Sequence, residues 1–81
     1  MEWNKASAFC SKLGDGWRLP TKDELKEIYL NQQKVGRLNM GYYWSSSESN
    51  FILAQDLNMV NSGGDYTDKE KFRYVRAVKS R

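Results

Sequence analysis

Eight residues, Trp17 to Glu24, constrain the fold of this chain more than any other segment. They read Trp-Arg-Leu-Pro-Thr-Lys-Asp-Glu. Thr21 and Glu24 have the spacing of a capping box, in which each side chain accepts a hydrogen bond from the backbone N–H of the other residue. Pro20 favours extended backbone at the residue before it. We therefore expect a short strand over residues 17–19 that leads directly into a helix.

The sequence around this segment predicts two helices. Apolar residues recur at helical spacing over about residues 3–13, and Gly14 is well placed for the left-handed position that ends a helix. Asn4 or a residue upstream of this chain is expected to cap the first helix. The second helix begins after Thr21 and has an acidic first half, which suits the helix dipole. Its apolar face carries Leu25, Ile28 and Tyr29.

From residue 42 onward the pattern changes to strands, after a long connection over residues 31–41. Residues 42–47 are aromatic and hydroxyl-rich, as in a strand. The next strand is expected to place Phe51, Leu53 and Leu57 on one face and Ala54 and Asp56 on the other. Residues 61–65 predict a turn between antiparallel strands. Residues 72–78 are apolar on both faces, which predicts a central strand. Two helices followed by an antiparallel sheet make an α+β domain.

Composition argues against several kinds of function. The chain has 81 residues, enough for one domain. It has no histidine and one cysteine, so it lacks the commonest general base and forms no internal disulfide or cysteine-rich zinc site. No apolar run has transmembrane length, and no signal peptide is evident. The net charge of +3 is mild, and no nucleic-acid motif accompanies it. The methionine directly before the first helix suggests an excised or C-terminal part of a larger protein.

Four sequence blocks in order carry a resemblance that covers residues 3–78. They are Trp3-x-x-Ala6-x-x-x-Cys10-x-x-Leu13, Trp17-Arg18-Leu19-Pro20-Thr21-x-x-Glu24-Leu25, Tyr43-Trp44-Ser45-Ser46 and Tyr74-Val75-Arg76-x-Val78. Their succession resembles the Lcl C-terminal-domain family of bacterial and phage surface proteins. That family is a branch of the C-type-lectin-like fold and is distantly similar to the formylglycine-generating-enzyme group. The resemblance implies one C-type-lectin-like domain, with two helices packed on a small antiparallel sheet, located outside the cell or at its surface.

The sequence departs from the family pattern in two ways. Family members often have a second cysteine in the last strand, at the position of Ala77, and Cys10 would pair with it. Alanine at that position makes Cys10 a buried, unpaired thiol. Family domains also usually have a strand or two before the first helix. Without such a strand we expect an exposed sheet edge, covered by residues of the parent chain or by a partner.

The motif residues are expected to be structural. Trp17 and Trp44 are expected to pack in the core and not to stack on a sugar ring. Arg18 is expected to form an internal ion pair or a hydrogen bond to a carbonyl and not to contact a ligand. Ser45, Ser46 and Ser47 lack an activating base, so they are expected to hydrogen-bond within the sheet. The residues assigned to the structural motif are Trp17, Arg18, Pro20, Thr21, Glu24 and Trp44.

Polar loops are the better candidates for binding, because binding groups usually lie on loops. The predicted ligand-binding residues are Glu48, Asn50, Asn61, Asp65, Tyr66 and Asp68. Their carboxylates are hard oxygen donors that suit calcium. However, the Glu-Pro-Asn type of signature found in sugar-binding C-type lectins is missing, so no metal site and no cofactor are predicted. Basic residues in 69–73 and 79–81 are expected to form a solvated face, with a sulfated glycan or another polyanion as the alternative partner.

These observations predict a non-catalytic recognition module of a bacterial surface or secreted protein. Its expected ligand is a glycan or a protein, with or without anionic groups, and no nucleic acid. An enzyme of the formylglycine-generating kind would need a pair of active-site cysteines, and this chain has only Cys10. The alternative is a structural or assembly domain that docks neighbouring subunits through an exposed sheet edge.

Overall fold

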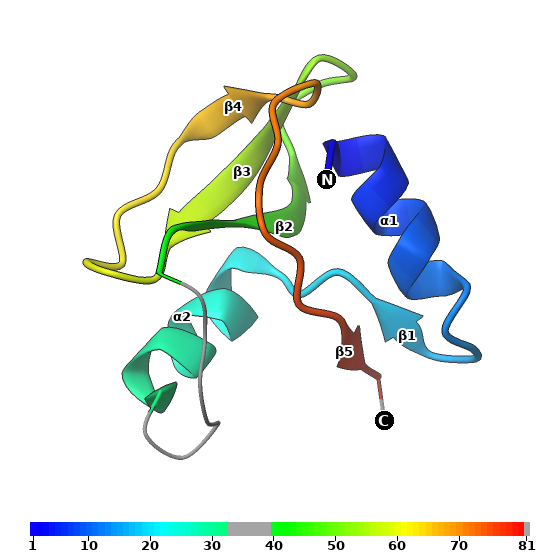
Figure 1. Ribbon diagram of the computed structural model, residues 1–81, viewed down its shortest axis with the longest axis horizontal. Coiled ribbons are helices and arrows are strands. Elements are labelled where there is room, and N and C mark those ends of the chain that lie inside the picture. Colours follow the sequence, from blue (N-terminus) through cyan, green and yellow to red (C-terminus); the bar gives the residue numbers. More distant parts are fainter. Residues whose placement is uncertain (33–39, 81) are drawn as a thin grey trace.

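The computed structural model describes residues 1–32 and 40–80 (Figure 1). Its elements are α1 (Trp3–Ser11), β1 (Trp17–Arg18), α2 (Lys22–Leu30), β2 (Tyr42–Glu48), β3 (Leu53–Asn58), β4 (Tyr66–Asp68) and β5 (Val78–Lys79). Strands β2, β3 and β4 form an antiparallel sheet in that order, while β1 pairs with β5 in a separate antiparallel ladder. Two helices with antiparallel strands confirm the α+β class. No helix in the described ranges is long and apolar enough to cross a membrane.

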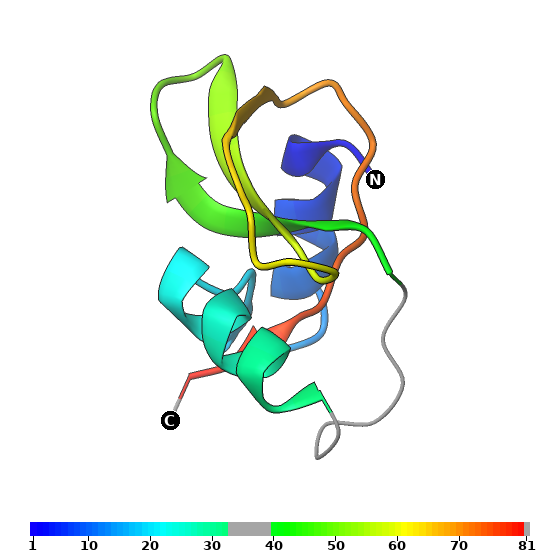
Figure 2. The same ribbon diagram turned by 90° about the vertical axis from the view of Figure 1, so that its left-hand side faces the viewer.

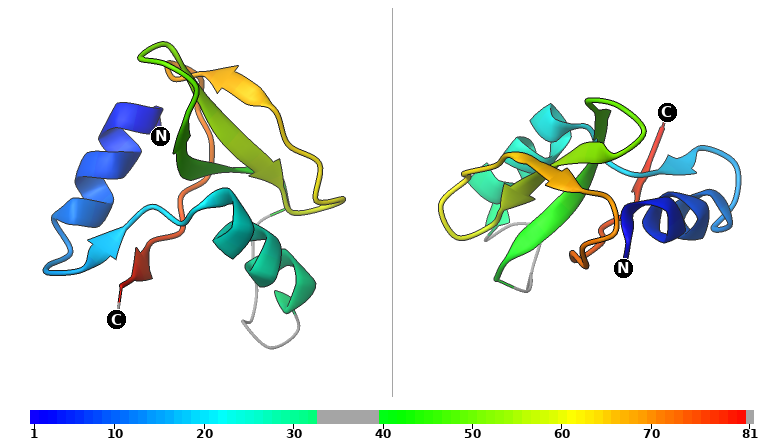
Figure 3. Two further views of the ribbon diagram at one scale, coloured as in Figure 1. Left: turned by 180° about the vertical axis from the view of Figure 1, so that it is seen from behind. Right: turned by 90° about the horizontal axis from the view of Figure 1, so that it is seen from above.

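The core consists of two apolar clusters that meet at β2. Because successive side chains of a strand point to opposite faces, Tyr43 and Trp44 enter different clusters. The first cluster joins α1 to the sheet and contains Trp3, Ala6, Cys10, Leu19, Trp44 and Ala54. The second joins α2 to the sheet and contains Leu25, Tyr43, Leu57 and Met59. The two helices accordingly lie apart from each other, as Figures 2 and 3 show.

The segment from Trp17 to Glu24 folds as the sequence predicts, except that the strand ends one residue earlier than expected. Strand β1 ends at Arg18, and α2 begins directly after Thr21. The Thr21 hydroxyl accepts from the Glu24 N–H at 3.1 Å, and Glu24 Oε1 accepts from the Thr21 N–H at 2.8 Å. The capping box is therefore complete. At α1 the cap prediction is wrong, because Asn4 lies inside the helix and the residue at the cap position, Glu2, makes no side-chain capping bond.

Two strand predictions need correction. Phe51 precedes β3 and is 86% exposed, so it does not share a buried face with Leu57. The run over residues 72–78 is not a central strand. Tyr74 makes an isolated parallel bridge to Tyr43, and only Val78 belongs to a regular strand. The reason is that this segment crosses from the sheet to β1, so its two ends pair with different neighbours.

Other sequence predictions are confirmed. Cys10 is fully buried without a disulfide, and burial raises the pKa of its thiol. Ala77 packs against the same cluster. The predicted turn over residues 61–65 connects β3 to β4. Most of the connection predicted over residues 31–41 lies outside the described residues.

Candidate functional site

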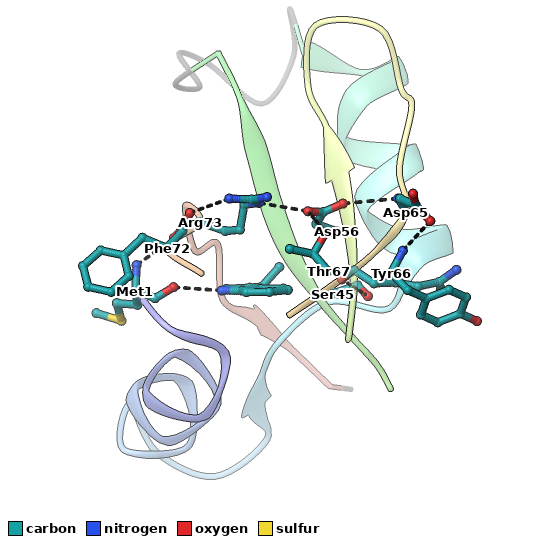
Figure 4. A network of polar contacts seen from close by, with 10 residues as sticks. Met1, Ser45, Asp56, Asp65, Tyr66, Thr67, Phe72 and Arg73 are labelled. Atoms are coloured by element: carbon teal, nitrogen blue, oxygen red, sulfur yellow. Dashed lines mark hydrogen bonds and ion pairs between the residues drawn. The ribbon is translucent and has the colours of Figure 1, made fainter. Parts of the chain in front are cut away.

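A buried carboxylate organises one face of the three-stranded sheet. Asp56 of β3 is 1% exposed and lies opposite Trp44 in the register of β2 and β3. Its Oδ2 accepts from Thr67 Oγ1 at 2.8 Å and from Arg73 Nε at 2.9 Å, and its Oδ1 accepts from the Asp65 N–H at 3.2 Å (Figure 4). These bonds matter because a buried charge without partners costs several kcal/mol.

Arg73 is held from several directions at once. Besides its bond to Asp56, its Nη1 donates to the carbonyl of Phe72 at 2.9 Å. Its guanidinium carbon lies 5.0 Å from the ring centroid of Tyr42 and 6.0 Å from that of Trp44, within the range of cation–π attraction. Its backbone N–H donates to the Met1 carbonyl at 3.0 Å, and its carbonyl accepts from the Met1 amine at 2.7 Å. The position of the guanidinium is therefore fixed by both its side chain and its backbone.

Arg73 lines an open hollow of about 370 Å³, which we call the aromatic hollow. The other lining residues are Met1, Tyr42, Phe72 and Tyr74. The three aromatic side chains are all exposed. The Tyr74 ring lies 5.4 Å from the buried Tyr43 ring, so its position is supported from below. A hollow of this size falls within the range of small-ligand sites, about 300–1,000 Å³.

The structure divides the six predicted ligand-binding residues between the two ends of the sheet. One group lies beside the β2–β3 loop and consists of Glu48, Asn50 and Asp68. The other lies at the β3–β4 turn and consists of Asn61, Asp65 and Tyr66. The six are thus not brought together. In residues 1–32 and 40–80, no group of acidic or cysteine side chains is arranged to hold a metal ion.

Most polar groups of these six residues hold their own loops. Asn50 Oδ1 accepts from the N–H groups of Ile52 and Leu53 at 2.8 and 2.9 Å. Asn61, Asp65 and Asp68 likewise each accept from a nearby backbone N–H, at 2.8, 2.7 and 2.9 Å respectively. Such local bonds are the usual role of Asn and Asp in turns. Tyr66 is the one aromatic residue among the six, and its side chain is exposed.

Two cations of the predicted basic face are paired with carboxylates of the fold instead of being freely solvated. Lys69 is 6% exposed; its Nζ lies 2.6 Å from Glu48 Oε2 and 4.4 Å from the ring centroid of Trp3. Arg73 is bonded to Asp56, as described above. The expectation of a solvated basic face over residues 69–73 is therefore wrong for both residues. The sequence contained no signal for it, because the partners lie 21 and 17 positions away.

The motif residues have structural roles. Arg18 forms two hydrogen bonds with Glu24, at 2.6 and 2.9 Å, and its Nε donates to Ser80 Oγ at 2.7 Å. Its hydrogen bond, followed by the backbone bond from Thr21, lowers the pKa of Glu24 to about 2. The same hydrogen bond raises the pKa of Arg18. The ion pair predicted for Arg18 is confirmed.

The remaining motif predictions have mixed outcomes. Trp44 is fully buried, as predicted, whereas Trp17 is only half-buried. The Ser45 hydroxyl donates to the Gln55 carbonyl at 2.8 Å, which confirms the expected bond within the sheet.

The comparisons with known proteins add no relative. A scan of protein-family models found no match to this chain, and a search of curated protein sequences found none either.

Proposed function

We propose that this domain is a non-catalytic recognition module that binds a sugar ring of a glycan in the aromatic hollow. The observation that carries the proposal is the grouping of three exposed aromatic rings around one fixed arginine. Aromatic faces suit the apolar side of a pyranose, and such flat rings supply contact area at little conformational cost. The resemblance to a family of bacterial and phage surface proteins supports a place at the cell surface or outside the cell.

The arginine supplies the polar part of this recognition. Nε and Nη1 of Arg73 are used internally, whereas its Nη2 makes no hydrogen bond within the described part of the chain. The Nη2 group can therefore donate to a ligand oxygen. Because Asp56 and Phe72 hold the guanidinium in place, little side-chain entropy is lost when it binds.

Within residues 1–32 and 40–80, the candidate nucleophiles Ser45 and Cys10 have no activating partner, which supports a non-catalytic role. Ser45, the buried serine of the Tyr-Trp-Ser-Ser block, has its hydroxyl committed to the Gln55 carbonyl. The chain has no histidine to activate a nucleophile. The thiol of Cys10 is buried in the first cluster, and burial raises its pKa, which disfavours the reactive thiolate.

A glycan array followed by titration tests the proposal. We expect a saturable glycan ligand, and we expect Tyr74→Ala to weaken its binding about tenfold, equivalent to about 1.4 kcal/mol. Tyr66→Ala is the matched control, because Tyr66 and Tyr74 are the same residue type and are 48% and 46% exposed. A ligand whose affinity falls with Tyr66→Ala but not with Tyr74→Ala would move the site to the polar loops. An array without any saturable ligand would contradict the glycan proposal.

A second candidate is an assembly domain, favoured by the position of β4. This strand is the last in the three-stranded sheet and pairs with β3 alone among the described strands. An unpaired strand edge can add a strand from another chain. Sedimentation over a wide range of concentrations should then show association, whereas a monomer at every concentration would count against self-assembly through this edge.

A further inference from the structure

The loop between β2 and β3 holds two apolar side chains in solvent at a fixed position. Phe51 and Ile52 are both exposed. The loop is nevertheless ordered by the hydrogen bonds that Asn50 Oδ1 accepts and by a hydrogen bond from the Ser49 N–H to the Leu53 carbonyl at 3.0 Å. A further hydrogen bond, from the Lys69 N–H to the Ile52 carbonyl at 2.9 Å, ties the loop to the segment after β4. Phe51 and Ile52 are adjacent and line one hollow with polar residues, and contiguous apolar surface with a polar rim is characteristic of interaction sites.

These two side chains line a hollow of about 390 Å³, which we call the acidic hollow. Three carboxylates also line it, those of Glu2, Asp68 and Glu70. The acidic hollow and the aromatic hollow share no lining residue, so the two sites are separate.

The charge of the acidic hollow is negative. Lys69 also lines it, but its ammonium group is taken up by Glu48 and the Trp3 ring. Glu2 has only a distant exposed partner, Lys5 at 3.9 Å, which contributes little. Asp68 and Glu70 have no ion-pair partner in residues 1–32 and 40–80. A negative hollow in a chain of net charge +3 is a local reversal of sign.

We propose that the acidic hollow docks a segment of a partner protein in which an arginine or lysine stands beside an apolar residue. The cation lies between the carboxylates and the face of Phe51, where charge-assisted hydrogen bonds and cation–π attraction act together. The neighbouring apolar side chain covers Ile52. Complementary charge favours a basic protein segment over a membrane. An exposed apolar loop can insert into a membrane, but the carboxylates of the acidic hollow repel anionic headgroups.

The probe is an array of short synthetic peptides with arginine or lysine placed beside leucine. In matched peptides each basic residue is replaced by norleucine or by glutamate. We expect the labelled protein to bind the basic peptides only, with binding that weakens as sodium chloride is added. Equal binding to the norleucine peptides, or no binding to the basic ones, would overturn the proposal.

Paired variants locate the site. Phe51→Ser and Glu70→Lys are each expected to weaken peptide binding about tenfold, while both residues are exposed enough to leave the melting temperature almost unchanged. Glu70→Lys should in addition gain binding to the glutamate peptides. Phe72→Ser is the control, because it removes an exposed phenylalanine from the aromatic hollow and should leave peptide binding intact.

Two other occupants are also tested. If the protein binds vesicles that contain phosphatidylserine and Phe51→Ser abolishes this binding, the partner is a membrane and the proposal is overturned. Self-association that Phe51→Ser abolishes would make the partner a second copy and overturn it as well. Neither result bears on the aromatic hollow, so the glycan proposal stands or falls separately.

Discussion

Two arginine–carboxylate pairs of this domain differ in burial and in the distance between their partners along the chain. Arg18 and Glu24 are six residues apart, and their side chains are 39% and 37% exposed. Arg73 and Asp56 are 17 residues apart, and the Asp56 side chain is 1% exposed. The first pair joins β1 to α2 within a short motif. The second joins β3 to an irregular segment that returns from the far end of the chain.

The two pairs differ in whether they contribute to the candidate binding site. The exposed pair includes the Glu24 carboxylate of the capping box, which also accepts from Thr21, and the pair lines neither of the two hollows described above. The buried pair holds the arginine that lines the aromatic hollow. We therefore expect damage to the buried pair to affect both folding and the candidate site, and damage to the exposed pair to affect stability alone.

The largest expected effect is that of Asp56→Ala. It leaves Arg73 partly buried without its carboxylate and removes the acceptor of two further donors, so we expect a loss of about 3–5 kcal/mol in the free energy of unfolding. Urea denaturation measures it. Asp65→Ala, which removes a more exposed carboxylate nearby, is the control and should cost less than about 1 kcal/mol. Equal losses of stability for the two variants would contradict the special role of the buried pair.

The capping box predicts a smaller loss. Thr21→Ala removes the acceptor for the Glu24 N–H and should cost about 1 kcal/mol. Thr21→Ser keeps a hydroxyl at the cap and should recover most of that stability. Both values come from the same urea titrations, and an unchanged midpoint for Thr21→Ala would contradict a role for the cap.

Acid should expose the Glu24 contribution. The folded-state pKa of Glu24 is about 2, below its ordinary value of 4.5. The stability that the Glu24 carboxylate contributes to the fold is therefore fully present above pH 4.5 and is lost as the pH falls toward 2. The stability difference between the wild type and Glu24→Gln should therefore shrink over this window. Since both partners are more than a third exposed, we expect a total below about 1 kcal/mol. A difference that stays constant from pH 6 to pH 2 would contradict the lowered pKa.

The sequence could predict what is local. The capping box, the apolar face of α2 and the turn between β3 and β4 depend on residues a few positions apart, and all three are confirmed. The burial of Cys10, expected from the alanine at position 77, is also confirmed.

Contacts between residues far apart in the chain could not be predicted from the sequence. The partners of Lys69 and Arg73 are set by how the segment after β4 crosses the sheet, which no short pattern encodes. The spacing between Phe51 and Leu53 predicts that Phe51 belongs to the strand, but the turn held by Asn50 leaves Phe51 outside β3. The six predicted ligand-binding residues stay a prediction, although most of their polar groups now have local roles.

The most direct test of the central proposal is to map the bound glycan on the domain by amide chemical shifts. Titrated with the best ligand from the array, the protein should show its largest shifts at Tyr42 and over residues 72–74, which line the aromatic hollow. Residues 61–66 at the β3–β4 turn serve as the internal control. Shifts confined to residues 48–50 and 61–66, with the aromatic hollow unaffected, would contradict the proposal and return the site to the polar loops.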